Sequence, residues 1–399
     1  MERISERKFL VFILSFSFIL RISFVFYLKN YLYFDDEFEY LKMVKNFLSG
    51  KGLIVNENFK SFRPPLYPLI LSILFYLKFN FLHIRIFQSL ISTFTVYIIY
   101  QISKEIFGKK EGTLSAIISS FYPFFIFYNG FLLTETFFLF FVVLSIFYLI
   151  KLSDTNGIIS LKAGVMSGVA GLTRPTFQIF IPFVILKLLF LKENLKLKFR
   201  KVFFLVIGFC IVLSPWIIRN YKIFKKFIPG TTMGGWVFWE GNNPFSDGGP
   251  CSYFPQNIHQ IEEITRDKLL YKMTIEVIKK NPKRFLYLLK NKFKRFWNIV
   301  PNAPEFEEKI LYRIISISSF GILLPFFIIG FFVSFKNSKA NFLHILIFIF
   351  TVFHMIYLAS IRYRLPIEPF YIIFSVHGFF YTLDLFKKFF RPNTYLKIS

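Results

Sequence analysis

Long apolar runs alternate with short polar segments along the whole chain. Runs of 16 or more residues with few charges occupy the stretches 9–28, 84–103, 113–129, 132–150, 158–173, 175–191, 202–218, 314–334, 342–359 and 365–384. A helix of about 20 apolar residues crosses the hydrocarbon core of a bilayer. The pattern therefore predicts an all-α fold, a polytopic membrane protein of about ten transmembrane helices with a small outer loop domain.

One further apolar piece, residues 66–79, is short and has Pro64, Pro65 and Pro68 at its start. Runs of this length are more often re-entrant or interfacial than spanning. If it does not cross, the basic clusters of the other loops all fall on one side, which the positive-inside rule makes the cytoplasm. These clusters are Arg3/Arg7/Lys8, Lys104/Lys109/Lys110, Lys151/Lys162, Lys192/Lys196/Lys198/Arg200/Lys201, Lys336/Lys339 and Lys387/Lys388/Arg391.

This topology places both termini in the cytoplasm and the longest polar segments on the outer face of the cell (inner) membrane. No small-residue cleavage site follows the first span, so we expect an uncleaved anchor. We expect an N-terminal transmembrane catalytic module over 1–218, with a first outer loop at 29–65. An outer loop domain over 219–312 and C-terminal transmembrane helices over 313–399 would follow.

The composition agrees with a membrane protein and excludes other classes. Of the 399 residues, 55% are hydrophobic and 61 are Phe, and the net charge is +26. Lys and Arg stand in short clusters between apolar runs, as membrane orientation requires, so we expect no nucleic-acid partner. The two cysteines and five scattered histidines exclude a disulfide framework and form no zinc motif.

Carboxylates gather just after the first apolar run, in YFDDEFEY at residues 33–40. Asp36 and Glu37 in this stretch are candidates for acid–base chemistry at the outer face, and a solvated acidic loop is the alternative. Glu135 in LLTETFF stands at the mouth of an apolar helix, where a carboxylate is costly and usually functional. The alternative for Glu135 is a residue that stabilises the N-terminus of that helix.

Arginines stand at short outer junctions, where the orientation rule disfavours positive charge. They are Arg63 in FRPPLYP, Arg174 in GLTRPTF, Arg219 in SPWIIRNY, and Arg362 and Arg364 in SIRYRLP, together with Arg21 near the outer end of the first span. The planar guanidinium group forms paired hydrogen bonds with phosphate, so the phosphate of a lipid is the expected ligand. For each arginine taken singly, the alternative is snorkelling or pairing with a nearby carboxylate.

Carboxylates and phosphate-binding arginines on one water-facing rim suit group transfer from a lipid phosphate. A carboxylate can accept the proton of an acceptor hydroxyl as it attacks a sugar carbon, and arginines can stabilise the departing phosphate. The chain has no P-loop and no G-x-G-x-x-G after a strand, which agrees with a donor delivered by lipid. The alternative is a non-enzymatic transporter of a lipid or solute. Transporters tend to place ionisable groups near the bilayer midplane, often with internal repeats, and neither feature is evident here.

The order of the motifs resembles the GT-C superfamily of polytopic glycosyltransferases. The resemblance rests on LR in the first span, DDEFEYLKMVKNFLSGKGL, RPPLYP, LLTETFF, GLTRPT, PWIIRNY, GNNP, NPKRFL and RYRLPIEP, and runs from about residue 15 to about residue 370. The most similar branches are glycosyltransferase family 39, which is protein O-mannosyltransferase-like, and the aminoarabinose transferases. No single motif is specific, but their sequential order is.

The resemblance implies that the donor is a polyprenyl- or dolichyl-phosphate sugar and that the reaction inverts the anomeric centre. It leaves open the sugar, a hexose or pentose, and the acceptor, a hydroxyl of a glycan, lipid or protein. In this family the first outer loop carries an Asp-Glu pair whose Asp is the proposed base, which corresponds to Asp36 and Glu37, followed by Tyr40. We expect no metal requirement, although the oxygen atoms of Asp36 and Glu37 could hold a divalent cation.

The expected roles follow from both arguments. In the catalytic group, Asp36 is the base, and Glu37 and Glu135 orient the base or the acceptor. The substrate-binding group consists of Arg21, Tyr40, Arg63, Arg174, Arg219, Arg362 and Arg364.

The outer loop domain contains turn-forming Gly and Asn residues beside Trp236 and Trp239, which could line a sugar site or act as interfacial anchors. Residues 262–280 and 283–299 are expected to form two amphipathic helices at the membrane surface, broken at Asn281-Pro282. Gly164, Gly168 and Gly171 are expected to permit close helix packing.

Overall fold

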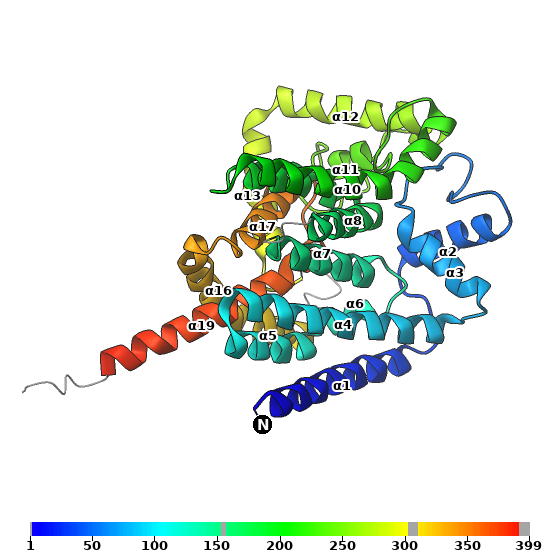
Figure 1. Cartoon of the computed structure of the whole chain (residues 1–399). Helices are drawn as coiled ribbons and strands as arrows, with labels where there is room; N and C mark the ends of the chain where they lie inside the picture. The colour runs from blue at the N-terminus through cyan, green and yellow to red at the C-terminus, as the bar shows by residue number, and fades with distance from the viewer. Residues whose placement is uncertain (1, 153–156, 302–309, 391–399) are drawn as a thin grey trace, which may run out of the picture.

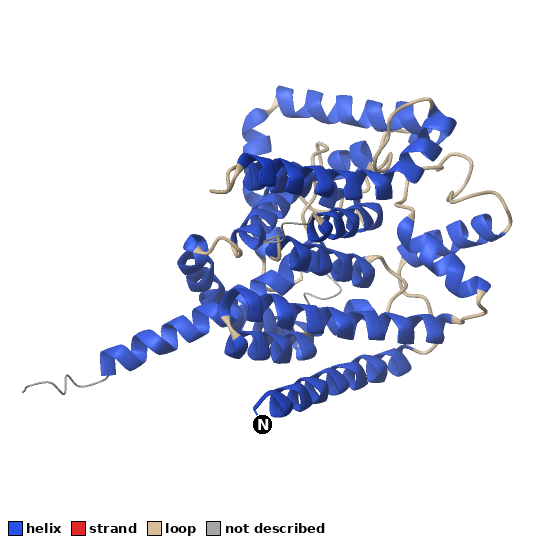
Figure 2. Ribbon diagram, in the orientation of Figure 1, coloured by secondary structure: helices blue, strands red, loops and turns tan. Residues whose placement is uncertain are grey.

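The computed structural model describes residues 2–152, 157–301 and 310–390. Within these ranges the chain consists of helices joined by loops, with an isolated β-bridge between Asn56 and Phe59 and no strand (Figure 2). The expected all-α fold is confirmed. Residues 302–309 of the expected loop domain, and Arg391 of the last basic cluster, lie outside the described ranges, and the domain boundaries stay a prediction.

Most of the helices are labelled in Figure 1. Their bounds are α1 (Glu2–Leu28), α2 (Asp35–Leu48), α3 (Leu66–Tyr76), α4 (Phe81–Phe107), α5 (Lys109–Phe121), α6 (Pro123–Asn129), α7 (Glu135–Ile150), α8 (Ile158–Thr173), α9 (Phe180–Leu189), α10 (Leu195–Phe224), α11 (Gly234–Glu240), α12 (Glu263–Lys280), α13 (Pro282–Trp297), α15 (Ile310–Ser316), α16 (Ile322–Val333), α17 (Asn341–Ile356), α18 (Ile361–Arg364) and α19 (Glu368–Phe390).

Long apolar helices confirm that the chain is an integral membrane protein. In the part of the chain that the structure describes, five segments are long and apolar enough to cross a bilayer: Arg7–Leu28, Phe81–Phe107, Leu195–Phe224, Ile310–Lys336 and Ile361–Phe389. Shorter apolar helices of 10–17 residues accompany them: Leu66–Tyr76, Glu135–Ile150, Ile158–Thr173, Pro175–Leu189 and Asn341–Ile356.

Two prolines account for how the expected spans map onto these helices. The stretch 113–129 was expected as one span but forms α5 and α6, which are broken at Pro123 because proline cannot donate the backbone hydrogen bond that a continuous helix needs. The short piece 66–79 forms α3, which follows Pro65 and has 11 residues. At 1.5 Å per residue α3 is about 16 Å long, too short for a hydrocarbon core of about 30 Å, as expected for a re-entrant or interfacial helix.

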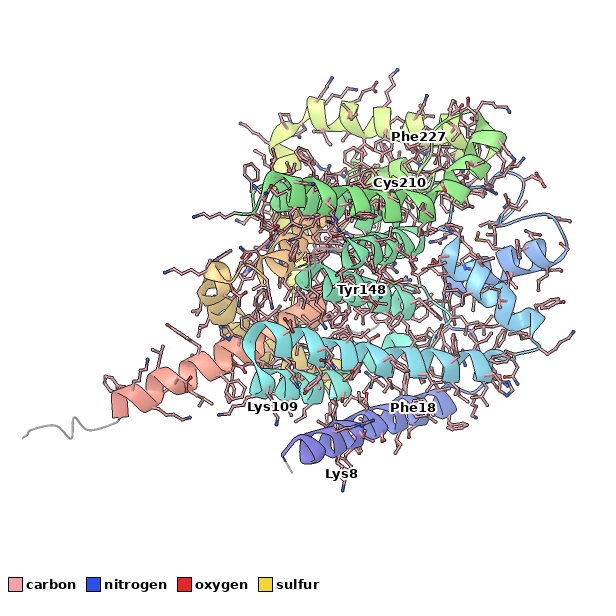
Figure 3. The ribbon with its side chains drawn as sticks, in the orientation of Figure 1. Lys8, Phe18, Lys109, Tyr148, Cys210 and Phe227 are labelled. Atoms are coloured by element: carbon pink, nitrogen blue, oxygen red, sulfur yellow. The ribbon has the colours of Figure 1, made fainter. Side chains whose placement is uncertain are left out.

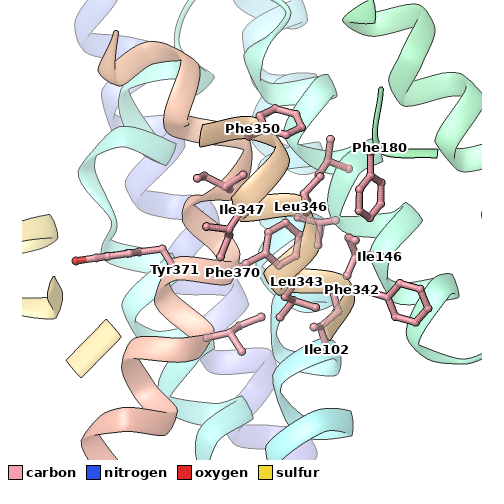
Figure 4. Packing of buried hydrophobic residues seen from close by; sticks show 14 of the residues in the cluster. Ile102, Ile146, Phe180, Phe342, Leu343, Leu346, Ile347, Phe350, Phe370 and Tyr371 are labelled. Carbon is pink, nitrogen blue, oxygen red and sulfur yellow. The ribbon is translucent and has the colours of Figure 1, made fainter. Parts of the chain in front are cut away.

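The core lies where α4, α7, α17 and α19 meet. Buried side chains from these helices pack against one another there, among them Ile102, Ile146, Leu346 and Phe370 (Figure 4). The outer segments of the bundle pack onto this core. Close-packed apolar side chains at its centre give the loops at the helix ends a rigid support.

Helices α8 and α10 pack at unusually close range. A Cβ atom on Gly164 would lie 2.0 Å from the carbonyl oxygen of Leu205, and one on Gly208 would lie 2.5 Å from that of Leu161. Only glycine allows backbones to approach this closely, so the packing role expected for Gly164 is confirmed.

The two ends of the bundle differ chemically. At one end the basic loops come together: Lys187 donates to the carbonyl of Ser338, and Lys339 is ion-paired with Glu105. Lys8 and Lys109 lie at this same end, away from α2 and α3 (Figure 3). At the other end, which we call the loop end, lie the segments 29–65, 130–134, 174–175, 225–262 and 357–364.

Candidate active site

Glu37 fixes the start of α2. One carboxylate oxygen accepts hydrogen bonds from the backbone N–H groups of Tyr33 (2.6 Å) and Phe34 (3.0 Å), and the other accepts from the N–H of Leu132 (2.8 Å). The side chain is fully buried. Because three backbone donors occupy its two oxygens, Glu37 holds α2 against the segment before α7 and has no free oxygen for a substrate.

The side chain of Asp36 points away from that of its neighbour Glu37 and contacts the segment Arg63-Pro64-Pro65. Nη2 of Arg63 lies 2.7 Å from Oδ1 of Asp36, and Nε of Arg63 lies 2.5 Å from Oε2 of Glu39. Asp36 and Glu39 are three residues apart on α2 and therefore share a face of the helix. Arg63 thus bridges two carboxylates of the first loop.

A second arginine joins Asp36 to the start of α7. Nη2 of Arg362 lies 2.8 Å from Oδ2 of Asp36, and Nε of Arg362 is ion-paired with Oε1 of Glu135. Arg174 meets the same Glu135 oxygen at 2.7 Å and donates through Nε to the hydroxyl of Thr134 at 2.9 Å. Glu135 therefore holds two guanidinium groups in place.

These contacts form one chain of alternating charges across the loop end. We call it the carboxylate–guanidinium cluster; its members in order are Glu39, Arg63, Asp36, Arg362, Glu135 and Arg174. Three positive and three negative groups balance, which is how buried or half-buried charges are tolerated. The side chain of Glu135 is only 1% exposed, whereas those of Asp36 and Glu39 are 21% and 32% exposed. Of the two carboxylates that an incoming molecule can reach, Asp36 is the one that lies between two arginines.

The pKa of Asp36 reflects this setting. Burial alone would raise the pKa, but the positive charges of Arg362 and Arg63 outweigh burial and lower it below its ordinary value. Asp36 is therefore ionised at neutral pH.

Tyr40 packs against Arg63, a member of the cluster. Its ring is buried, lies edge-on to the ring of Tyr67 at 5.1 Å between centroids, and has the guanidinium carbon of Arg63 5.9 Å from its centroid. Burial raises the pKa of the Tyr40 hydroxyl, which therefore stays protonated. Tyr40 is placed to orient Arg63.

Two of the expected phosphate-binding arginines are instead buried in the bundle. Arg21 donates to the hydroxyl groups of Ser17 (2.5 Å) and Ser92 (2.7 Å) and to backbone carbonyls of α5, which ties α1 to α4 and α5. Arg364 is paired with Glu368 at 3.0 Å and donates to the carbonyl of Asn298 at 2.7 Å. Both side chains are fully buried and tie helices together, although Nη2 of Arg364 has no hydrogen-bond partner among the described residues. Their expected role in substrate binding stays a prediction.

Arg219 forms hydrogen bonds with the first outer loop. It donates to the carbonyls of Leu53 (3.3 Å) and Lys60 (2.9 Å) and lies over the ring of Trp216, with 4.5 Å from guanidinium carbon to ring centroid. Its contacts fix the segment that leads to Arg63. Arg219 is thus a positioning residue in this structure.

Other buried charges that hold the same loop were not expected from the sequence. Arg85 at the start of α4 donates to the carbonyls of Lys29 and Tyr31. Glu263 at the start of α12 accepts from the backbone N–H groups of Lys60 (2.7 Å) and Ser61 (3.0 Å). A charge at the mouth of an apolar run was the available signal for Arg85, the same signal that singled out Glu135.

The tryptophans of the loop domain lie inside it. Trp239 is buried and donates through Nε1 to the carbonyl of Tyr253 at 2.6 Å. Trp236 stacks on Phe254 at 4.0 Å between centroids and lies edge-on to Phe62 at 5.7 Å. Trp239 packs within the loop domain, whereas Trp236 is half-buried and lies between this domain and the first outer loop. The two helices expected over 262–280 and 283–299 form as α12 and α13, separated at Asn281. Their place at the membrane surface stays a prediction.

The GNNP turn is fixed by the NPKRFL motif. Arg284 donates to the carbonyls of Asn243 (2.9 Å), Pro244 (3.1 Å) and Ser246 (2.7 Å). The buried amine of Lys292 donates to the side-chain oxygen of Asn242 at 2.7 Å. These contacts fix the turn that follows α11 against α13.

Comparisons with known proteins identify the architecture. Residues 62–218 match the sequence model of the family described as dolichyl-phosphate-mannose-protein mannosyltransferase. The structure matches the oligosaccharyltransferase AglB from Archaeoglobus fulgidus, in complex with an inhibitory peptide and a dolichol-phosphate. The TM-score is 0.60 at 12% identity, over 97% of this chain and 52% of that chain. The chain has the GT-C fold.

A second solved structure has the same fold as this chain. ArnT from Cupriavidus metallidurans bound to undecaprenyl phosphate matches with a TM-score of 0.51 at 12% identity, over 92% of this chain and 59% of that chain. No curated protein matches the chain by sequence. The chain spans about half the length of the archaeal transferase it matches. The resemblance inferred from the order of motifs is confirmed.

The carboxylate–guanidinium cluster joins residues inside the segment that the family model matches to residues outside it. Arg63, Glu135 and Arg174 lie inside the matched segment 62–218, whereas Asp36 and Arg362 lie on either side of it. The site is therefore assembled from three separate regions of the sequence.

The oxygens of Asp36 and Glu37 meet nitrogen donors in this structure. Among the described residues no group of three or more His, Cys, Asp or Glu side chains could hold a metal ion. Each oxygen of Asp36 is ion-paired with an arginine, and both oxygens of Glu37 accept backbone hydrogen bonds. The expectation of no metal requirement, with a divalent cation at Asp36 and Glu37 as the alternative, stays a prediction.

Proposed function

We propose that this protein is a glycosyltransferase that moves a hexose or pentose from a polyprenyl- or dolichyl-phosphate to an acceptor hydroxyl on the outer face of the cell membrane. The observation that carries the proposal is the carboxylate–guanidinium cluster, which puts one reachable carboxylate between two arginines at the loop end. The family match and the two GT-C neighbours, one with a dolichol-phosphate and one with undecaprenyl phosphate, support a donor of this chemistry.

The distribution of charge supports a site on the outer face. Lys339, Lys187 and Lys109 lie at the end of the bundle opposite the cluster, and basic loops face the cytoplasm in membrane proteins. The loop end then faces outward, where a lipid can deliver an activated sugar. No comparison supports the alternative of a transporter, and the cluster lies at one end of the bundle rather than at its middle.

The cluster suggests how the donor is bound. A lipid phosphate entering beside Arg362 and Arg174 competes with Glu135 and Asp36 for their guanidinium groups, because phosphate accepts the same paired hydrogen bonds as carboxylate. When Arg362 turns toward the phosphate, one oxygen of Asp36 is released. Donor binding thereby prepares the base.

The reaction is a single displacement at the anomeric carbon. The acceptor oxygen forms a bond to this carbon as the bond to the phosphate oxygen breaks, which inverts its configuration. The acceptor proton passes to Asp36, and the electron pair leaves with the lipid phosphate, whose growing negative charge Arg362 and Arg174 stabilise. Glu135 keeps the two arginines oriented.

Purified protein in lipid nanodiscs tests the proposal. It would be incubated with labelled dolichyl- and undecaprenyl-phosphate hexoses, and release of label from the lipid, to water or to an acceptor, would be measured. Asp36→Asn should lower the rate by about 10²- to 10⁴-fold, the range for loss of a general base. The exposed neighbour provides the control, Asp35→Asn, which should retain the wild-type rate. A wild-type protein that neither binds polyprenyl phosphate nor releases sugar would overturn the function, and full activity of Asp36→Asn would remove Asp36 as the base.

A further inference from the structure

The first residue of α12 holds the backbone of the first outer loop just before Arg63. One carboxylate oxygen of Glu263 accepts the backbone N–H of Lys60 at 2.7 Å, and the other accepts the N–H of Ser61 at 3.0 Å. The second oxygen also accepts the hydroxyl of Thr232, from the segment before α11. The side chain of Glu263 is buried. Because both of its oxygens are used, Glu263 fixes the place of this part of the loop.

The end of α10 holds the same part of the loop from a second direction. Arg219 donates to the carbonyl of Lys60 at 2.9 Å, and the hydroxyl of Ser61 donates to the side-chain oxygen of Asn220 at 3.1 Å. Asn220 is buried and donates through its amide nitrogen to the carbonyl of Ile228 at 3.0 Å. The backbone of Lys60 is thus bound on one side by α12 and on the other by α10.

A second side chain of α12 packs on this loop. The guanidinium carbon of Arg266 lies 4.1 Å from the centroid of the Phe59 ring, and its Nη2 donates to the carbonyl of Asn58 at 3.3 Å. Arg266 is buried and follows Glu263 by three residues, so both side chains lie on the same face of the helix. One face of α12 therefore binds four successive residues of the loop, 58–61.

The connection from this anchor to Arg63 is short and has little freedom. A single residue, Phe62, separates Ser61 from Arg63. The Phe62 ring is buried and meets the ring of Phe59 edge-on at 4.9 Å. Arg63 precedes Pro64, and the residue before a proline is restricted to extended backbone conformations. A displacement of the anchored backbone would therefore move Arg63 with it.

Arg63 carries the anchoring into the carboxylate–guanidinium cluster, since its Nη2 lies 2.7 Å from Oδ1 of Asp36. On the basis of the proposed function, in which Asp36 is the base, we infer that Glu263 is a positioning residue for the transfer reaction: from the start of α12 it keeps Arg63 in contact with Asp36. Glu263 acts through the backbone of Lys60 and Ser61 and touches no reacting group itself. The loop domain thereby helps to keep the base ready for the acceptor proton.

The groups that face Asp36 come from several elements. Burial raises its pKa, whereas the positive charges of Arg362, Arg63 and Arg174 lower it. Arg63 also meets Glu39 of α2. The other titratable side chains on which the charge of Asp36 acts are Glu135 of α7, Tyr40 of α2, Glu240 of α11 and Tyr363 of α18. Glu263 is not one of these groups, so its influence on Asp36 has to pass through the position of Arg63.

Charge and position predict opposite effects of Glu263→Gln on the base. Loss of a negative charge alone would leave the pKa of Asp36 unchanged or lower it, whereas a looser contact with Arg63 would raise it. We expect the acid limb of kcat/KM for the lipid donor to move up by about 0.5 to 1 pH unit, part of the 1–3 units that a nearby opposite charge supplies. Glu276→Gln, which removes an exposed carboxylate from the same helix, is the matched control and should keep the wild-type limb.

A double-mutant cycle tests whether the effect passes through Arg63. When Arg63→Gln is already present, adding Glu263→Gln should move the acid limb by no more than about 0.2 pH units, the tolerance of such a cycle. Glu263→Asp keeps the charge but withdraws the oxygens by one methylene group, so it should move the limb in the same direction as Glu263→Gln. It carries the test if Glu263→Gln does not fold.

Carbodiimide labelling of Asp36 provides a readout that needs no turnover. Carbodiimides react with protonated carboxyl groups, so the pH midpoint of labelling at Asp36, assigned by fragment-ion mass spectrometry, reports the ionisation of this side chain. The midpoint should rise in Glu263→Gln and stay at the wild-type value in Glu276→Gln.

The outcomes separate the inference from the proposed function. If wild type releases no sugar from any lipid donor, the proposed function fails, and the labelling midpoint alone decides whether Glu263 holds Arg63 on Asp36. An unchanged midpoint and acid limb in the folded Glu263 variants would overturn the inference. A shift that persists at full size in the presence of Arg63→Gln would overturn it as well, because Glu263 would then act by another route.

Discussion

Nη2 of Arg362 lies 2.8 Å from Oδ2 of Asp36, so the last third of the chain is ion-paired with the loop that follows the first helix. The same guanidinium group also holds Glu135. Arg362 therefore closes the site from the side of α18 and sets both the protonation of the expected base and the orientation of the carboxylate at the start of α7.

Replacing Arg362 with Gln should lower the rate of sugar release from the lipid donor by about 10²- to 10³-fold, the cost of removing one preorganised group that stabilises developing negative charge. Undecaprenyl phosphate should also bind more weakly, which equilibrium titration in nanodiscs would measure. Arg295→Gln is the control, because Arg295 pairs with the exposed Asp247 at the surface of the loop domain. Equal rates in Arg362→Gln and wild type would contradict a role at the phosphate.

Replacing Arg63 with Gln should move the acid limb of the pH–rate profile to higher pH. Arg362 and Arg63 lower the pKa of Asp36 below its ordinary value, so the base stays ionised well below neutral pH in wild type. Removing one positive charge raises this pKa, and activity should then be lost at a higher pH as the solution is acidified. The measurement is kcat/KM for the lipid donor between pH 4 and 8. An unshifted acid limb would show that Asp36 is not the titrating base.

Replacing Glu37 with Gln should reduce stability more than it changes chemistry. The buried carboxylate accepts three backbone N–H groups, and the Gln amide would set an NH₂ donor against donors. The expected loss is about 1–3 kcal/mol, the cost of unsatisfied buried groups. Thermal unfolding in detergent would show this loss of stability as a lower Tm. Asp35→Asn is the control and should keep the wild-type Tm. A wild-type Tm together with lost turnover would instead point to a direct catalytic role for Glu37.

Replacing Gly164 with Ala should push α8 and α10 apart. The new Cβ would lie 2.0 Å from the carbonyl oxygen of Leu205, which is backbone and cannot turn aside. A loss of about 3 kcal/mol is expected, at the upper end for overpacked cores. Gly171→Ala is the control, because there the nearest atom is Cγ of the Gln178 side chain at 2.9 Å, which can shift. Equal Tm values for the two variants would argue against close backbone contact between α8 and α10.

The positions of the helices follow from the sequence because each apolar run needs hydrocarbon on its surface and internal hydrogen bonds along its backbone. The same reasoning placed α3 as a short non-spanning helix. This reasoning wrongly predicted a single span over 113–129. The apolar run continues through Pro123, but the backbone hydrogen bonds of the helix are interrupted there.

The sequence also predicted that carboxylates and arginines gather at one end of the bundle, since the charge pattern assigns the loops that carry them to the same side of the membrane. The charge pattern alone did not separate Asp36 from Glu37, which only the resemblance did, and it did not separate Arg362 from Arg364. Residues one or two positions apart on a helix point in different directions. Only the packing of the neighbouring helices decides which of them meets the site and which is buried: Arg362 reaches Asp36, whereas Arg364 turns inward to Glu368.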